Sequence, residues 1–143
     1  MKTHAFFTAM ALLVITGASA QSGELVSVDP ETQRAYYSRT DRYTIETDGT
    51  FSGNIVAYYE DGSTEEVGAL TGGEKDGNWV KYNQNGDIIA TARYKQGMKD
   101  GVWKVWDGEG NLRMTMYFDD GKRTGTWKIF GPDGKVLDEK NYK

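Results

Sequence analysis

The C-terminal half of the chain contains a regular alternation of apolar and polar residues. Leu112, Met114, Met116 and Phe118 are apolar, and the residues between them are polar apart from Tyr117. A period of two is typical of a β-strand with one buried face. No segment after residue 20 combines the apolar spacing of a helix with helix caps. The pattern therefore predicts an all-β protein.

Strand-like segments occur in pairs that are separated by turn residues. Residues 79–82 and 88–94 are rich in strand formers, and Asn85-Gly86 between them is a strong hairpin turn signal. We expect residues 96–101 to connect this hairpin to the next one. A lone hairpin is only marginally stable in water, so successive hairpins should pair edge to edge.

The register of this hairpin depends on the kind of turn. A two-residue turn pairs Trp79 with Ala92, whereas a bulged turn moves Trp79 to the opposite face of the sheet. The sequence leaves both registers open.

Glycine and aromatic residues recur along the chain with a constant period of about 24 residues, which lies in the range of repeat proteins. Three glycine columns hold 12 of the 18 glycines and provide turn or strand-entry positions. The columns are Gly49, Gly73, Gly97 and Gly121; Gly53, Gly77, Gly101 and Gly125; Gly62, Gly86, Gly110 and Gly134; Trp79, Trp103 and Trp127; and Tyr82, Trp106 and Phe130. We therefore expect an elongated antiparallel meander of repeated β-hairpins that forms one open-ended, twisted sheet.

The repeats divide the chain into segments. Residues 1–20 have a basic start, a short apolar run and an Ala-Ser-Ala ending, which is typical of a cleaved secretory signal peptide. We expect an exported protein, periplasmic or extracellular. Residues 21–30 are interpreted as an N-terminal lead or cap, and residues 31–143 as a β-hairpin repeat domain. This domain begins with a degenerate repeat, 31–52, and continues with regular repeats at 53–76, 77–100, 101–124 and 125–143.

Composition narrows the chemistry that the exported chain can perform. The 143 residues include no cysteine and one histidine, His4, which lies in the predicted signal peptide. The mature chain therefore has no cysteine or histidine for catalysis or for metal binding. Removing residues 1–20 takes away one lysine and no acidic residue, so the net charge changes from −4 to −5. We expect no enzyme activity, no cofactor and no nucleic-acid partner, and the negative charge disfavours contact with membrane surfaces.

Residues 94–106 and 118–130 carry a motif that resembles a known repeat type. Each motif has two glycines with three residues between them. One residue after the second glycine comes a tryptophan, and an aromatic residue stands three positions after that tryptophan. This spacing resembles the MORN-type repeat and looks most like the MORN variants of the YwqK-type antitoxin-like family, over residues 49–143. The resemblance implies an elongated, non-catalytic β-hairpin array that binds a protein partner, or a membrane surface in some MORN proteins.

Two aromatic columns provide the candidate binding face. If these rings are exposed, they form a ladder on which sugars can stack, and if they are buried, they are the core of a thin sheet. The sequence leaves both interpretations open. The residues are Trp79, Trp103, Trp106, Trp127, Tyr82 and Phe130.

Charged residues near the turn glycines have simpler interpretations. Lys75, Lys99 and Arg123 repeat with the period of the glycines, and we interpret them as solvated charges of the connections. Aspartate beside glycine is ordinary turn chemistry, and no calcium-loop spacing occurs, so no metal site is expected. The aspartates are Asp61, Asp76, Asp100, Asp119, Asp120 and Asp133.

The sequence favours an exported protein-interaction or scaffold module. The alternative is a carbohydrate or cell-envelope binding module that uses the aromatic ladder. A row of solvent-exposed rings along one face would favour that alternative. The last strand, near residues 136–142, is expected to be a terminal edge whose Asp138 and Lys140 discourage edge pairing.

Overall fold

The computed structural model describes residues 25–28, 35–45 and 47–143. The predicted signal peptide lies outside these residues. The described residues form β-strands, and they include no helix that could cross a membrane. The strands are β1 (Leu25–Val28), β2 (Ala35–Ile45), β3 (Phe51–Tyr58), β4 (Thr64–Thr71), β5 (Glu74–Tyr82), β6 (Ile88–Lys95), β7 (Met98–Lys99), β8 (Gly101–Trp106), β9 (Leu112–Asp119), β10 (Lys122–Phe130) and β11 (Val136–Tyr142).

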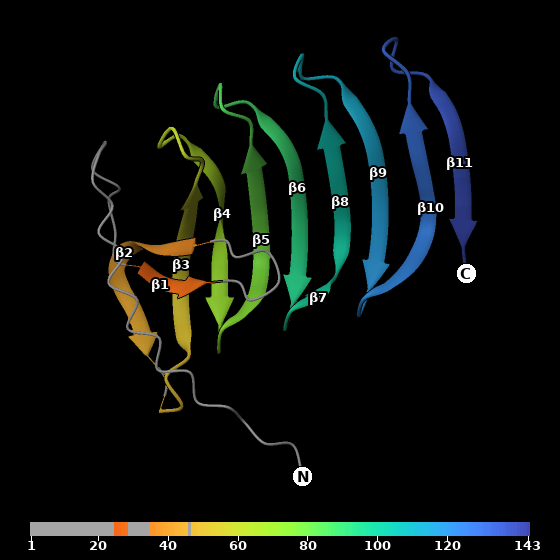
Figure 1. Cartoon of the computed structure of the whole chain (residues 1–143). Coiled ribbons are helices and arrows are strands. Elements are labelled where there is room, and N and C mark those ends of the chain that lie inside the picture. Colours follow the sequence, from red (N-terminus) through yellow and green to blue (C-terminus); the bar gives the residue numbers. More distant parts are fainter. Residues whose placement is uncertain (1–24, 29–34, 46) are drawn as a thin grey trace.

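The strands form one open antiparallel sheet in which sequence neighbours pair (Figure 1). The order is β1-β2-β3-β4-β5-β6-β8-β9-β10-β11, and the short strand β7 pairs with β6. Local hairpin turns produce this order without a crossover. The predicted all-β meander is therefore confirmed. Strand β1 lies within residues 21–30, the segment that the sequence assigned to a lead or cap.

The hairpin turns at one end of the strands contain three residues each. In the β5–β6 hairpin, Asn83 N donates to Asp87 O at 2.9 Å, and Gly86 N donates to Asn83 O at 3.0 Å. A bulge at Ile89, near the start of β6, then shifts the register back, so that Trp79 pairs with Ala92. The structure thus combines a bulged turn with the pairing that the sequence assigned to a two-residue turn. The two register shifts cancel.

The same register recurs in the neighbouring hairpins, one repeat apart. The residues equivalent to the Trp79–Ala92 pair are Ile55 and Gly68, Trp103 and Met116, and Trp127 and Lys140. The repeat length that the glycine columns predict is therefore the repeat length of the backbone pairing.

The turns at the other end of the strands contain two residues, and both of these residues have positive φ. The turn residues are Gly72-Gly73, Gln96-Gly97 and Asp120-Gly121. Turns of this kind match the twist of the strands that they join, so pairing continues up to the turn. The expected connection over residues 96–101 is accordingly wrong in its length, because β7 extends the pairing with β6 beyond the turn.

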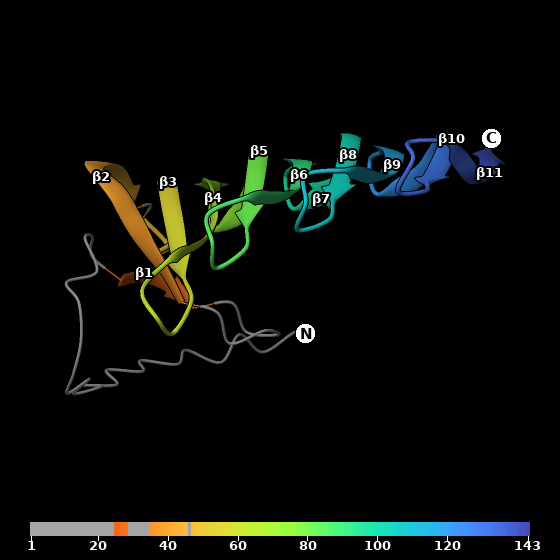
Figure 2. The same ribbon diagram turned by 90° about the horizontal axis from the view of Figure 1, so that it is seen from above.

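The sheet curls over its own face at the N-terminal end (Figure 2). The register between β2 and β3 shifts between Ser38 and Tyr43, and the first part of β2 reaches across to β5. There Tyr36 packs against Trp79 with 6.0 Å between ring centroids. The core that this fold encloses consists of Tyr36, Phe51, Ile55, Ala57, Leu70 and Trp79.

Strands β8–β11 extend from this core as a single layer (Figure 2). All of the large apolar side chains found exposed among the described residues lie after residue 87. They are Ile88, Met98, Val102, Tyr117, Ile129, Val136 and Leu137. One layer of sheet cannot bury both of its faces, so this half of the molecule presents apolar surface to solvent.

Candidate functional site

Seven aromatic rings contact one another in a row along one face of the sheet, which we call the ladder face. Neighbouring rings meet edge-on or tilted, with centroids between 4.8 and 6.0 Å apart. Such arrangements suit the charge distribution of aromatic rings. The row runs through Tyr36, Trp79, Tyr94, Trp103, Phe118, Trp127 and Tyr142.

Three cations lie over the tryptophans of this row. Lys75, Lys99 and Arg123 each stand four residues before a tryptophan, at 3.8, 4.7 and 5.0 Å from its ring centroid. Cross-strand pairing also places Lys99 opposite Tyr94 and Arg123 opposite Phe118. The cations belong to strands β5, β7 and β10, so their expected place in the connections is wrong, although Lys99 and Arg123 are exposed to solvent as expected. Cations in this position are attracted by the ring faces.

The six candidate rings from the sequence do not share one face. Trp79 and Tyr82 are three residues apart in β5, and the extra residue of the bulge beside Tyr82 belongs to β6, so alternation along β5 directs the two rings to opposite faces. The same spacing recurs in β8 and β10. Trp79, Trp103 and Trp127 lie on the ladder face, whereas Tyr82, Trp106 and Phe130 lie on the other face and make no ring contact with a described residue.

The tryptophans of the row differ in the hydrogen bonding of their indole N–H groups. Trp103 Nε1 donates to Arg93 O, and Trp127 Nε1 donates to Tyr117 O, both at 3.0 Å. Trp79 Nε1 is buried and finds no acceptor among the described residues.

The residue beneath each indole accounts for this difference. The ring of Trp79 lies flat against Gly68, where a Cβ would overlap with it. Ala92 and Met116 stand in the equivalent positions under the later tryptophans. Their Cβ atoms exclude the flat stack. Gly68 lies outside the glycine columns, so the repeat pattern gave no sign of its role.

The first cation site is covered and paired. Lys75 Nζ donates to Glu66 Oε1 at 3.0 Å, and the two side chains are 20% and 10% exposed. The ring of Tyr36, brought by β2, is a third ring near Lys75, with its centroid 5.8 Å from Nζ. Trp79 beneath them is 1% exposed. This cation therefore has a carboxylate and three rings around it.

The next two cation sites are open. The positions equivalent to Glu66 in the two following repeats hold Ala90 and Met114. Lys99 and Arg123 are exposed, and no described carboxylate forms an ion pair with either of them. Arg123 Nη1 donates only to Tyr142 Oη, at 3.4 Å. Within the described part of the chain, these cations thus contact aromatic rings but have no carboxylate partner.

A shallow, mostly apolar groove lies beside the last of these sites. It has a volume of about 180 Å³, and Met114, Trp127, Ile129 and Tyr142 form its apolar lining. Asp138 and Lys140 of β11 lie at its border. The groove continues the ladder face to the last strand of the sheet.

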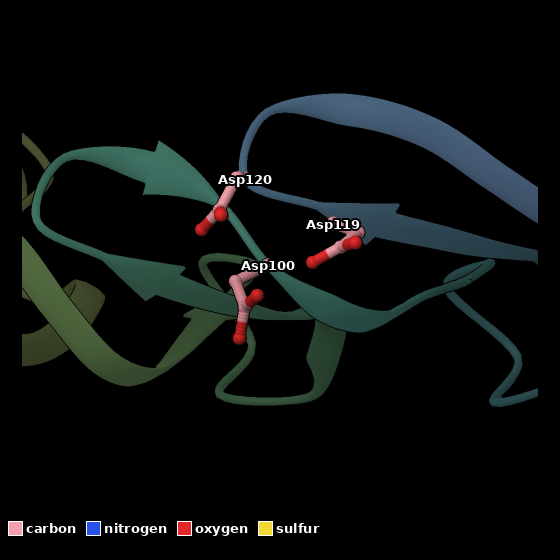
Figure 3. A group of neighbouring side chains, drawn as sticks. All are labelled: Asp100, Asp119 and Asp120. Atoms are coloured by element: carbon pink, nitrogen blue, oxygen red, sulfur yellow. The ribbon is translucent and has the colours of Figure 1, made fainter.

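Three aspartates meet near the β7–β8 and β9–β10 turns (Figure 3). Carboxylate oxygens of Asp100, Asp119 and Asp120 lie within 4.8 Å of one another. Lys95 Nζ pairs with Asp120 at 3.1 Å, and Arg93 Nε pairs with Asp100 at 3.3 Å. These exposed ion pairs balance two of the three charges, and the cluster is compatible with the turn chemistry that the sequence indicated.

A family comparison matches the repeats that carry this site. The model of the MORN repeat variant matches three consecutive segments, 75–96, 99–122 and 123–143. The segments begin with Lys75, Lys99 and Arg123 and together span β5 to β11. The similarity to MORN-type repeats that the sequence indicated is therefore confirmed for these three repeats. Comparison with curated proteins gives no match.

Proposed function

We propose that this chain is an exported, non-enzymatic protein-interaction or scaffold module, built from MORN variant repeats of the YwqK type. The observation that carries the proposal is the single-layer half of the sheet. Apolar side chains such as Val102 and Leu137 are 43% and 69% exposed there, and the ladder face ends in an apolar groove. An exposed apolar groove with charged residues at its border is typical of protein interaction sites.

The geometry of the rings supports a protein partner rather than a glycan. Sugar stacking needs an open aromatic face. In the row, rings meet edge-on or tilted, and the cations lie over the tryptophan faces. The one aromatic side chain among the exposed large apolar residues is Tyr117, which lies on the other face. The row of solvent-exposed rings that the carbohydrate alternative needs is thus missing from the described residues.

Affinity capture tests the proposed interaction. The purified protein is immobilised and exposed to a periplasmic extract and to culture fluid, and retained proteins are identified by mass spectrometry. Beads that carry the Gly101→Val variant, whose sheet we expect to be disrupted, are the control. A protein retained by the native sheet and not by the variant supports the proposal. Absence of any such protein, together with quenching of tryptophan fluorescence by cell-wall polysaccharide, would favour the glycan alternative instead.

Export rests on the sequence of residues 1–20 and has its own test. After expression with these residues present, the intact mass of the exported protein should correspond to cleavage after Ala20, with Gln21 as the first residue. Recovery of the full-length chain in the cytoplasm alone would contradict the proposal. We expect the mature chain, with its net charge of −5, to bind neither nucleic acid nor membranes.

A further inference from the structure

The ladder face is completed at its first cation site and incomplete at the next two. At Lys75 the fold itself supplies a carboxylate from Glu66 and a ring from Tyr36. At Lys99 and Arg123 both are missing, and the tryptophans beneath are half-buried rather than buried. The covered site therefore shows which chemical groups suit the open ones.

We propose that the open sites, at Lys99–Trp103 and Arg123–Trp127, bind an extended segment of a partner protein that carries carboxylate and aromatic side chains. The inference rests on the proposed function, because it specifies the partner of a protein-binding module. Each partner carboxylate would take the place that Glu66 has beside Lys75. Each partner ring would cover the cation and the tryptophan as Tyr36 does at the first site.

Charge and shape both favour this occupant. The open sites combine an unpaired cation with apolar neighbours such as Met114 and Met116, so a ligand with charge alone would leave the apolar surface exposed. An apolar ligand alone would cover the cation without pairing it, which is costly. A segment with both groups satisfies both requirements. At Trp79 the chain already brings such a ring on an extended strand, β2, while the carboxylate of Glu66 comes from β4.

The spacing of the two sites sets the spacing of the ligand groups. Trp103 lies in β8 and Trp127 in β10, with β9 between them. Strands in a sheet are about 4.8 Å apart, so the sites are separated by roughly 9.6 Å. A segment in the extended polyproline II conformation advances about 3.1 Å per residue and directs every third side chain to the same side. A segment that crosses the strands would therefore engage both sites with groups about three residues apart, and double engagement strengthens binding.

A synthetic peptide of three Tyr-Glu-Ser units is the probe for this proposal. The indole N–H signals of the four tryptophans can be followed by NMR in the ¹⁵N-labelled protein as the peptide is added. We expect the signals of Trp103 and Trp127 to shift. The Trp79 signal should not shift because Tyr36 already covers that site, and Trp106 lies on the other face. Peptides with lysine in place of glutamate, or serine in place of tyrosine, should bind at least about tenfold more weakly.

Charge-reversal variants on the two faces make the test specific. Lys99→Glu and Arg123→Glu should each weaken peptide binding by about tenfold or more. Lys104→Glu makes the same change of charge in β8, next to Trp103 but on the other face, and should change binding by less than about twofold. Arg123→Lys should retain most of the affinity. Circular dichroism and melting temperature establish that each variant is folded.

Several results would overturn the inference. One is an equal shift of all four indole signals, and another is equal weakening by the variants of both faces. Equal competition by inorganic phosphate or by vesicles of phosphatidylglycerol would identify a general anion site instead. In the capture experiment, a partner that is retained equally by the Lys99→Glu and Arg123→Glu proteins would refute this inference and leave the proposed function intact. Capture of no partner by the native protein would count against the proposed function itself.

Discussion

At the scale of single residues, Gly68 is the glycine of the described chain at which an added Cβ would come closest to a neighbour, the indole of Trp79. A Cβ on Gly68 would overlap with the indole, and the ring is too deeply buried to move aside freely. We expect Gly68→Ala to lower the free energy of unfolding by about 1–3 kcal/mol, measured by chemical denaturation. Gly108→Ala is the control, because nothing lies within 4 Å of a Cβ there, and it should cost less than about 0.5 kcal/mol. A Gly68→Ala protein as stable as this control would contradict the flat stack.

Gly101 tests a different requirement, the backbone conformation at strand entry. Its φ is +65°, and a Cβ would lie 3.2 Å from Cδ of Arg93. A β-branched residue is strained in this conformation. Thermal and chemical unfolding should therefore show a loss of about 2 kcal/mol or more for Gly101→Val. If Gly108→Ala lost as much stability, the assigned repeat register would be refuted.

At the scale of elements, three of the three-residue turns contain an aspartate whose ionised carboxylate accepts hydrogen bonds within the turn: Asp61, Asp107 and Asp133. The pKa of Asp107 is lowered chiefly because Asn111 N donates to its carboxylate. The Ser63 hydroxyl is the largest cause of the lowered pKa of Asp61. A lowered folded-state pKa adds stability that is present above the unfolded pKa and is lost as pH falls through the folded value. We expect the melting temperature to decrease once the pH falls below about 4.

The Asp107→Asn variant isolates this effect. Asn83 occupies the equivalent position one repeat earlier, where its Oδ1 accepts from Asn85 N and Asp87 N. An asparagine at 107 should therefore preserve the turn while removing one titrating group. The melting temperature of the variant should decrease less between pH 5 and pH 3 than that of the native protein. An identical decrease would mean that this turn does not contribute to the acid sensitivity.

The hairpins themselves could be predicted because their requirements are local. Turn glycines such as Gly86 and Gly97 are needed where φ is positive, so they appear in sequence at the period of the backbone. The face of Trp79 could not be predicted, because two register shifts cancel and neither has a clear sequence signal. The contact between Tyr36 and Trp79 also escaped prediction, since it joins distant strands through the bend in β2.

The candidate site was predicted in part. The tryptophan column does lie in one row, but the column of Tyr82 lies on the other face. The odd spacing of three residues between Trp79 and Tyr82 contained that information, because strand residues three apart point to opposite faces. The sequence indicated a connection for Lys99 because residues 96–101 were expected to join two hairpins. A two-residue turn within this segment places Lys99 in a strand, opposite Tyr94.

At the scale of the whole molecule, burial decreases from the core around β3–β5 to β11. Trp79, which Tyr36 covers, is 1% exposed, whereas Leu137 of β11 is 69% exposed. In a linear array each repeat is stabilised mainly by its neighbours, so the least covered end opens most easily. The half of the sheet that carries the open cation sites is thus also the half with the least internal support, and a bound partner segment would stabilise it.

This gradient can be measured by hydrogen exchange and by matched tryptophan substitutions. Backbone amides of β3–β5 should exchange most slowly and those of β11 fastest, because opening β11 breaks pairing with one described strand only. Trp79→Ala should cost about 3–5 kcal/mol because it empties the core. Trp127→Ala removes a half-buried ring from the single layer and should cost clearly less, with faster exchange confined to β9–β11. Uniform exchange along the sheet, or equal costs for the two substitutions, would show that the molecule unfolds as one unit and not from its uncovered end.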